Sequence, residues 1–157
     1  MNTLLTPQRA VELAFAGGEY TDPAQIAAAT IAAAEGRYLK PVTGPALYEA
    51  LCAGRYPQLA EEWAAPAAAA AVRLLVLPRL HVQTGGCGLA AVAQQGWRAA
   101  GDRAVTELLK QARTELRALL ARLADHLETR RDDYPEYDPG ANILNRCRIH
   151  GDLVQIR

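Results

Sequence analysis

The chain has 157 residues, a length typical of one domain, and half of its residues are apolar, so a hydrophobic core can form. Its 17 Lys and Arg residues balance its 17 Asp and Glu residues. This balance argues against general nucleic-acid binding, because proteins that neutralise many phosphates usually carry a basic excess. The sequence contains neither a run of about 18 apolar residues nor a basic start followed by an apolar segment, so we expect no membrane span and no signal peptide.

Small side chains dominate the expected core. Much of the apolar half is alanine, and the aromatic residues are six Tyr, two Trp and one Phe. Such a core buries little area per residue, and oligomerisation is one common source of the missing stability. Cys52, Cys87 and Cys147 are far apart and form no CxxC pair, which is typical of reduced thiols in a cytoplasmic protein and argues against a metal site.

Start and stop signals predict two helices in the first forty residues. Thr6–Pro7 supplies a capping hydroxyl and a first-turn proline, and Gly17–Gly18 ends this helix. Asp22–Pro23 repeats the start signal, after which apolar residues recur at helical spacing. We expect Pro41 to end the second helix, since proline lacks a backbone donor.

Three further helices are predicted up to residue 82. One short helix begins at Gly44–Pro45 and ends at Ala53–Gly54, and the next begins at Pro57. We expect Pro66 to mark a boundary or a first turn, followed by a nearly all-apolar helix over residues 67–82 that Pro78 should kink. A helix that is apolar on most sides is buried on most sides, so it is predicted to be a central core or interface helix.

Residues 84–101 contain five glycines and few charges, which predicts a long loop or a flexible hairpin. Its apolar residues argue against simple disorder and indicate that the segment orders against another surface. The candidate contact residues here are Leu89, Val92 and Trp97.

The strongest pattern is an amphipathic helix from Asp102, the expected cap, to about Arg131. At ~1.5 Å per residue it is about 45 Å long, longer than a compact domain of this size is wide. Its apolar stripe consists of Val105, Leu108, Leu109, Ala112, Leu116, Leu119, Leu120, Leu123 and Leu127.

The C-terminal segment follows a turn-rich stretch at residues 134–140. Leu153, Val154 and Ile156 lie in a strand-like alternation, which invites pairing with a sheet edge in the same chain or a neighbour. The predicted fold is therefore all-α: a small multi-helix bundle over residues 1–132 with one long C-terminal helix and the glycine-rich loop 84–101, and an extended arm over residues 133–157. Leu153, Val154 and Ile156 join the candidate contacts with a subunit or a portal.

Catalytic and metal-binding candidates are weak. His81, His126 and His150 are the obvious catalytic candidates, but His81 and His126 have no neighbouring nucleophile, and positioned acid–base residues normally come as constellations. Cys87, flanked by glycines, has no assignable base, and the GK[ST] ending of a phosphate loop is missing. The acidic residues Asp132, Asp133, Glu136 and Asp138 do not form an EF-hand. We therefore predict no catalytic residue, no metal and no cofactor.

The order of these segments resembles the head–tail connector (adaptor) proteins of tailed bacteriophages and prophages. The resemblance rests on the helix that ends in residues 34–44, the short helix around Leu47–Leu51, the apolar helix 67–82, the loop 84–101 and the long helix 102–131. The string Tyr134–Tyr137 is similar to the variant in prophages of gut Bacteroides-like bacteria. The similarity covers most of the chain.

The resemblance implies a structural role without catalysis. Members form homo-oligomeric rings, often dodecamers, between the portal and the tail-completion proteins, and DNA passes through the ring without specific binding. The implied location is the cytoplasm of the bacterial host and then the virion, with no membrane. Residues 84–101 would become ordered on assembly, and the C-terminal arm would extend to a neighbour.

Two alternatives remain open at this point. One is a monomeric or dimeric helical regulator that captures a partner helix or peptide in an apolar groove. The other is a small enzyme that uses His126 or Cys87, for which no set of nucleophile, base and orienting residue can be placed.

Overall fold

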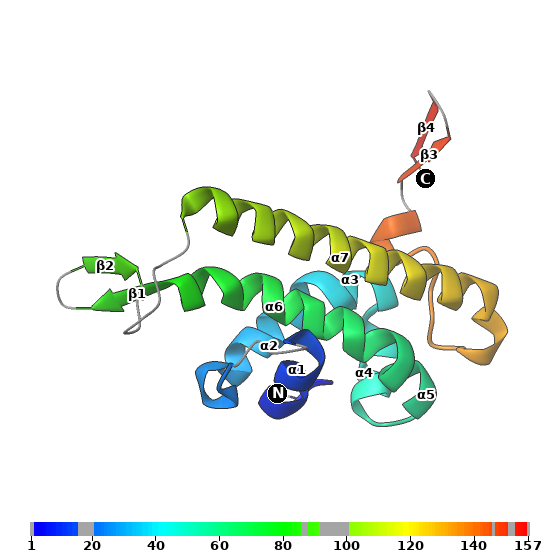
Figure 1. The fold of residues 1–157 in the computed structure, drawn as a ribbon. Coiled ribbons are helices and arrows are strands. Elements are labelled where there is room, and N and C mark those ends of the chain that lie inside the picture. The colour runs from blue at the N-terminus through cyan, green and yellow to red at the C-terminus, as the bar shows by residue number, and fades with distance from the viewer. Residues whose placement is uncertain are drawn as a thin grey trace.

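A computed structural model describes residues 2–15, 21–85, 88–91, 101–145, 147–150 and 153–156, within which residues 81–91 and those beyond 145 are described by their backbone. The body is all-helical, as predicted. Helix α6 (Ala65–His81) lies at its centre, and the long helix α7 (Asp102–Thr129) runs antiparallel to it along one side (Figure 1). Helices α1 (Pro7–Ala14) and α2 (Ala28–Ala34) pack on the other side of α6.

Alanine makes α6 the centre of the body. The residues Ala64, Ala65, Ala67, Ala68, Ala69, Ala70, Ala71 and Val72 are all buried. Small side chains let the backbones of neighbouring helices approach closely on several sides at once, and each methyl group removes its area from water. The sequence-based expectation that this apolar helix forms a central core is therefore confirmed.

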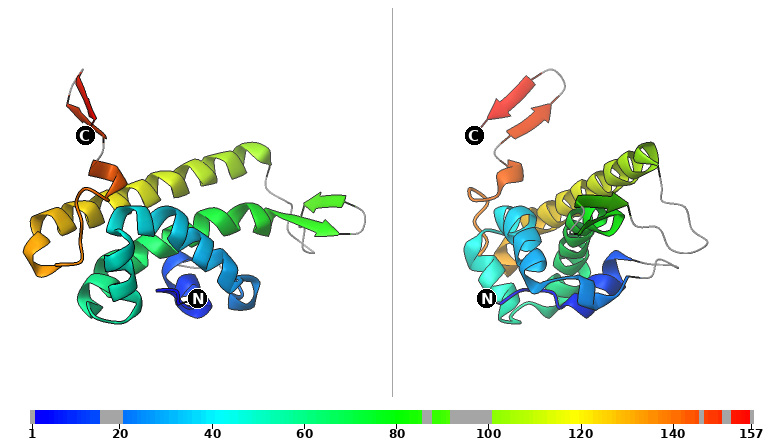
Figure 2. Two further views of the ribbon diagram at one scale, coloured as in Figure 1. Left: turned by 180° about the vertical axis from the view of Figure 1, so that it is seen from behind. Right: turned by 90° about the vertical axis from the view of Figure 1, so that its left-hand side faces the viewer.

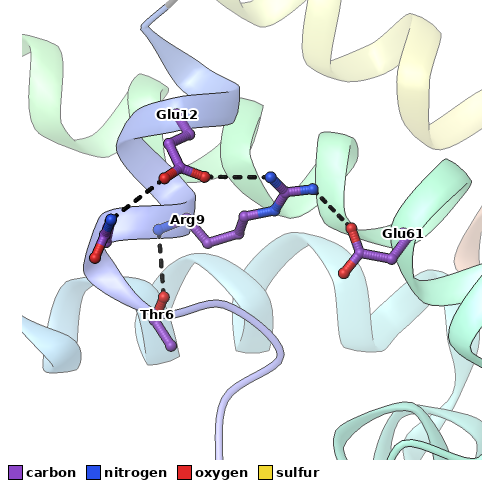
Figure 3. A network of polar contacts seen from close by, with 5 residues as sticks. Thr6, Arg9, Glu12 and Glu61 are labelled. Atoms are coloured by element: carbon purple, nitrogen blue, oxygen red, sulfur yellow. Dashed lines mark hydrogen bonds and ion pairs between the residues drawn. The ribbon is translucent and has the colours of Figure 1, made fainter.

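Helix α1 is fixed at its start and on its outer face by polar contacts (Figure 3). The backbone N–H of Arg9 donates to the Thr6 hydroxyl at 3.2 Å, which confirms Thr6 as the helix cap. The Arg9 guanidinium forms ion pairs with Glu12 in the same helix and, at 2.7 Å, with Glu61 in the segment Ala60–Ala64. These contacts raise the pKa of Arg9, chiefly through the hydrogen bond to Glu61, but the side chains are exposed and the ion pairs add little stability.

The second helix differs from its prediction at both ends. Pro23–Gln25 forms a separate 3-10 turn, and α2 begins only at Ala28. The helix then continues through a π-helical segment, Glu35–Leu39, into α3 (Lys40–Thr43), so the prediction that Pro41 ends it is wrong. It ends at Gly44, whose φ of 79° favours glycine.

Pro66 likewise lies inside a continuous helix. The helix begins with α5 (Pro57–Leu59), passes through a π-helical segment, Ala60–Ala64, and continues into α6, so a new helix does not begin at Ala67. In both cases the proline stands two residues after a π segment. A proline ring clashes with the carbonyl four residues earlier, here that of Arg37 or Glu62, and the wider π turn moves this carbonyl away. Pro78 is also inside α6 and does not end it.

Helix α4 (Pro45–Cys52) matches its predicted bounds. Gly54, with φ of 76°, follows its end, and Arg55 N donates to Ala50 O at 3.0 Å while Gly54 N donates to Leu51 O at 3.0 Å. These bonds satisfy carbonyls of the last turn.

Helix α7 also matches the prediction, with one correction at its start. Gly101 occupies the cap position and Asp102 is the first helical residue, so Asp102 is not the cap. Its carboxylate still lies in the first turn, where negative charge interacts favourably with the helix dipole.

Two strand pairs extend from the two ends of the α6–α7 pair (Figure 2). Strands β1 (Val82–Gly85) and β2 (Gly88–Ala91) form an antiparallel hairpin directly after α6. Beyond α7, 3-10 turns at Arg131–Asp133 and Ile143–Asn145 lead to a second antiparallel hairpin, β3 (Cys147–His150) and β4 (Leu153–Ile156).

One helical run is longer than the apolar helix that the sequence predicts over residues 67–82. Residues Pro57–Leu80 form a helix that is long and apolar enough to cross a membrane, with a mean hydropathy of 1.3 in its best window. More than half of that window, 56%, is buried inside the chain, and the core helix of a compact protein passes the same test of length and composition.

Candidate assembly surface

An apolar groove lies where the end of α6 meets the start of α7. It has a volume of about 510 Å³ and is lined by Leu77, Leu80, Ala104, Val105, Glu107, Leu108, Leu109 and Gln111. We name this set the α6–α7 groove. Its polar contributors, Glu107 and Gln111, are exposed, and Glu107 is paired with Lys110 at 2.8 Å, so the hollow itself is mainly leucine and valine.

The groove arises because the apolar stripe of α7 is longer than the helix against which it packs. From Ala112 to Leu127 the stripe is buried except at the half-buried Leu119, and Leu116, Leu123 and Leu127 are at most 3% exposed. Val105, Leu108 and Leu109, one to two turns earlier, are only half-buried. Since α6 ends at His81, the described helices provide no further surface for the first turns of α7.

The structure places four of the six predicted contact residues, in two regions. Leu89 lies in β2 opposite Thr84, whereas Val92 and Trp97 lie outside the described residues. Leu153, Val154 and Ile156 all lie in β4, paired with His150, Ile149 and Cys147. The two regions are at opposite ends of the α6–α7 pair (Figure 1), so the structure does not bring them together within one chain.

A set of hydrogen bonds holds the segment before the second hairpin on the body. Tyr137, 5% exposed, donates to Glu128 on α7 at 2.7 Å and accepts from the buried Asn142 amide at 2.8 Å. Asn145 also donates to Glu128. Burial, together with the Glu128 carboxylate, raises the pKa of Tyr137 to about 12, so this hydroxyl stays protonated. The segment up to Asn145 therefore packs on α7, and the hairpin starts from a fixed point.

A second contact fixes the same segment to the turn after α4. Tyr56 donates to Glu136 at 2.6 Å, and Arg55 pairs with the same carboxylate. The hydrogen bond from Tyr56 is the main cause of a lowered pKa at Glu136, and the same bond raises the pKa of Tyr56. In the predicted acidic cluster, Glu136 thus has a partner within the chain, and Asp138 accepts from Gly140 N at 2.9 Å.

His126 lies in an aromatic cluster instead of a catalytic set. Its ring stacks on Trp63 with centroids 4.3 Å apart, and its Nε2 is 3.1 Å from the Tyr134 hydroxyl. Burial, followed by the positive charge of Arg130, lowers the pKa of His126. The neutral ring is therefore favoured, and these contacts describe a packing role.

Sequence reasoning missed a buried carboxylate near the N-terminus. Glu35 is 0% exposed and accepts hydrogen bonds from Leu4 N at 2.9 Å, from Leu5 N at 3.0 Å and from the Tyr48 hydroxyl at 2.6 Å. Burial and this bond raise the pKa of Tyr48. Glu35 lies on the π segment, and no local sequence signal connects it with the backbone thirty residues earlier. Its bonds hold the N-terminal segment, with buried Leu5, on the body.

The cysteines and histidines offer no assembled reactive site in the described part of the chain. Cys52 is half-buried, and burial is the main cause of its raised pKa, which favours the unreactive thiol. Cys87 lies outside the described residues, and Cys147 and His150 are in β3. Among the described side chains, no group of three His, Cys, Asp or Glu residues is arranged to hold a metal ion.

Comparison with known proteins places the chain in a family. The model of a protein family, described as a family of unknown function (DUF6712), matches residues 29–146, which is more than half of the chain. This range runs from α2 to the start of the second hairpin and includes the whole α6–α7 groove. No curated protein and no solved structure matches the chain.

Proposed function

This chain belongs to the DUF6712 family, whose function is unknown, and we propose that it is a structural subunit of a phage or prophage head–tail connector ring. The ring would join the portal to the tail and line or surround the DNA exit channel. The observation that carries the proposal is the α6–α7 groove at one end of the long helix pair, with the C-terminal hairpin at the other end (Figure 1). Two unlike contact regions at opposite ends are what a ring subunit needs.

The physical basis is the symmetry of a ring. In a head-to-tail interface each subunit uses two different surfaces, and the assembly closes if the rotation between copies allows it. The half-buried Leu108 and Leu109 supply apolar area on one side, and the strand residues Leu153, Val154 and Ile156 supply it on the other. Residues 84–101 and the C-terminal arm are proposed to order fully when the ring forms.

The charge of the chain is compatible with a DNA channel. Seventeen basic and seventeen acidic residues leave no formal net charge, and the exposed residues of α7 include both signs, among them Arg113, Glu115 and Arg117. Tight phosphate binding would need a positive surface. A mixed surface lets DNA pass without being held, as the proposed role requires.

The direct test is assembly on a portal. The purified chain is mixed with the portal protein of the same phage genome and imaged by negative-stain electron microscopy. A ring added beneath the portal is the expected result. A matched pair of variants tests the surface: Ala104→Glu changes an exposed residue of the groove, and Ala118→Glu makes the same change at an exposed site elsewhere on α7. The first should abolish ring formation and the second should preserve it.

Other outcomes are decisive against the proposal. If the chain never associates with the portal, or if both glutamate variants form rings as well as the parent, the connector role by this surface is wrong. If the chain instead stays monomeric and binds an isolated amphipathic helix in the groove, it is a helical binding module.

A further inference from the structure

We infer that the C-terminal hairpin β3–β4 of one copy docks in the α6–α7 groove of a second copy. The inference rests on the proposed function, because it specifies which two surfaces meet when subunits assemble. The occupant of the groove is then a second copy of this chain.

The pairing register gives the hairpin two unlike faces. Cys147 pairs with Ile156 and Ile149 pairs with Val154, while Arg148 pairs with Gln155 and His150 with Leu153. Since residues alternate between the faces of a strand, the rows 147/156 and 149/154 share one face, and the rows 148/155 and 150/153 share the other. All four residues of the first face are apolar. An amphipathic hairpin of this kind matches an apolar groove.

A two-stranded hairpin needs such a surface. Its sheet contains only β3 and β4, and the tertiary contacts of β3 are chiefly with the adjacent turn Ile143–Asn145. An isolated two-stranded hairpin is at best marginally stable in water, and packing against a helix is one of the ways to stabilise it. The half-buried leucines of α6 and α7 provide a helical surface of the required chemistry.

The hairpin cannot reach the groove of its own chain. Asn145 is bonded to Glu128 near the end of α7, whereas Leu108 lies twenty residues earlier on the same helix, about 30 Å away at ~1.5 Å per residue. From Asn145 to the tip of β3 at His150 is five residues, which span about 17 Å at ~3.4 Å each. Figure 1 shows the hairpin directed away from the helices. A C-terminal hairpin that occupies the groove must therefore come from another molecule.

This contact makes assembly directional. Each copy donates one hairpin from the far end of α7 and accepts one at the near end, so the interface is heterologous and leaves a donor and an acceptor free until the ring closes. A chain without its hairpin keeps an acceptor, and a chain with a blocked groove keeps a donor.

A complementation experiment tests this arrangement. One variant ends at Asn145 and lacks the hairpin. The other keeps the hairpin and carries Ala104→Glu with Leu108→Glu in the groove, and Ala118→Glu serves as the control for an added carboxylate on α7. Masses are measured by light scattering after size exclusion, and circular dichroism checks that each variant retains the parent's helix content. We expect the parent and the control to associate, each variant alone to remain monomeric, and their mixture to form a 1:1 dimer and nothing larger.

Several results would overturn the inference. They are a parent that stays monomeric, a hairpin-less variant that associates as strongly as the parent, and a mixture that gives no dimer although both variants are folded. If Ala104→Glu alone folds and the double variant does not, the single variant replaces it in the same mixture.

The outcome is separable from that of the proposed function. If the hairpin-less variant still forms a complete ring on the portal, the docking inference fails and the connector role stands. If the 1:1 dimer forms but the parent never binds a portal, the docking holds and the connector role fails.

Discussion

At the scale of single residues, the buried carboxylate of Glu35 holds the N-terminal segment on the body through the backbone of Leu4 and Leu5. It is fully buried and accepts two backbone N–H groups and the Tyr48 hydroxyl. These three donors explain why a carboxylate can be buried here, because the hydrogen bonds that its two oxygens lose to water are replaced by hydrogen bonds within the chain.

We predict that Glu35→Gln lowers the free energy of unfolding by about 2 kcal/mol, since the amide would present a donor to a backbone N–H and leave a buried group unsatisfied. Urea unfolding measures the change. Glu49→Gln, at an exposed position of α4, is the matched control and should change stability by less than about 0.5 kcal/mol. Equal losses in the two variants would contradict this account of Glu35.

The lowered pKa of His126 predicts how the free energy of unfolding depends on pH. Burial and Arg130 lower its pKa in the folded chain, so the unfolded chain binds a proton more readily. The stability it contributes is present above the unfolded pKa of about 6.5 and is lost as the pH falls through the lower folded value. We expect the free energy of unfolding to fall from about pH 7 towards pH 5 less steeply in His126→Gln than in the parent, as followed by urea unfolding at each pH. Identical slopes would refute the role assigned to His126.

At the scale of elements, α7 is one helix with two environments. Its pattern of leucines is uniform along the sequence, but the stripe is mostly buried from Ala112 onward and only half-buried at Val105, Leu108 and Leu109. The transition follows from the end of α6 at His81, which no property of α7 itself reveals.

The two environments predict different costs for the same substitution. Leu123→Ala, at a fully buried site, should lower the free energy of unfolding of the monomer by about 3 kcal/mol, and Leu108→Ala by less than about 1 kcal/mol. Denaturant unfolding at low protein concentration measures both. The effects on self-association should have the opposite order. When both variants are folded, Leu108→Ala should weaken self-association more than Leu123→Ala does. A Leu108→Ala cost equal to that of Leu123→Ala would place Leu108 in the core.

The prolines illustrate how the elements combine. Pro41 and Pro66 each follow a π segment that displaces the carbonyl with which the ring would clash. Two helices therefore continue where the sequence predicts boundaries. Both π segments lie in helices packed on the core, so tertiary packing supports a local geometry that propensity alone disfavours.

At the scale of the whole molecule, a core built largely on alanine is consistent with the need for further buried surface. Assembly would provide it by mass action, because a partner that binds only the folded state raises its apparent stability.

The midpoint of thermal unfolding should therefore rise with protein concentration in the parent chain. It should be independent of concentration in the variant that ends at Asn145. Scanning calorimetry over a hundredfold range of concentration makes the comparison. A midpoint that does not move in the parent would contradict assembly of the folded chain with itself.

Local sequence patterns were enough to predict the all-helical class, the Thr6 cap, the bounds of α4, the extent of α7 and the central place of the alanine-rich helix. These features depend on periodicity and capping, which act within a few residues of one another. Three features could be seen only in the three-dimensional arrangement. The helices continue through Pro41 and Pro66, Glu35 holds the backbone of Leu4 and Leu5, and the apolar stripe of α7 extends beyond the end of α6. Each of these features depends on where segments that are distant in the sequence end or meet in space, and local sequence patterns do not specify that arrangement.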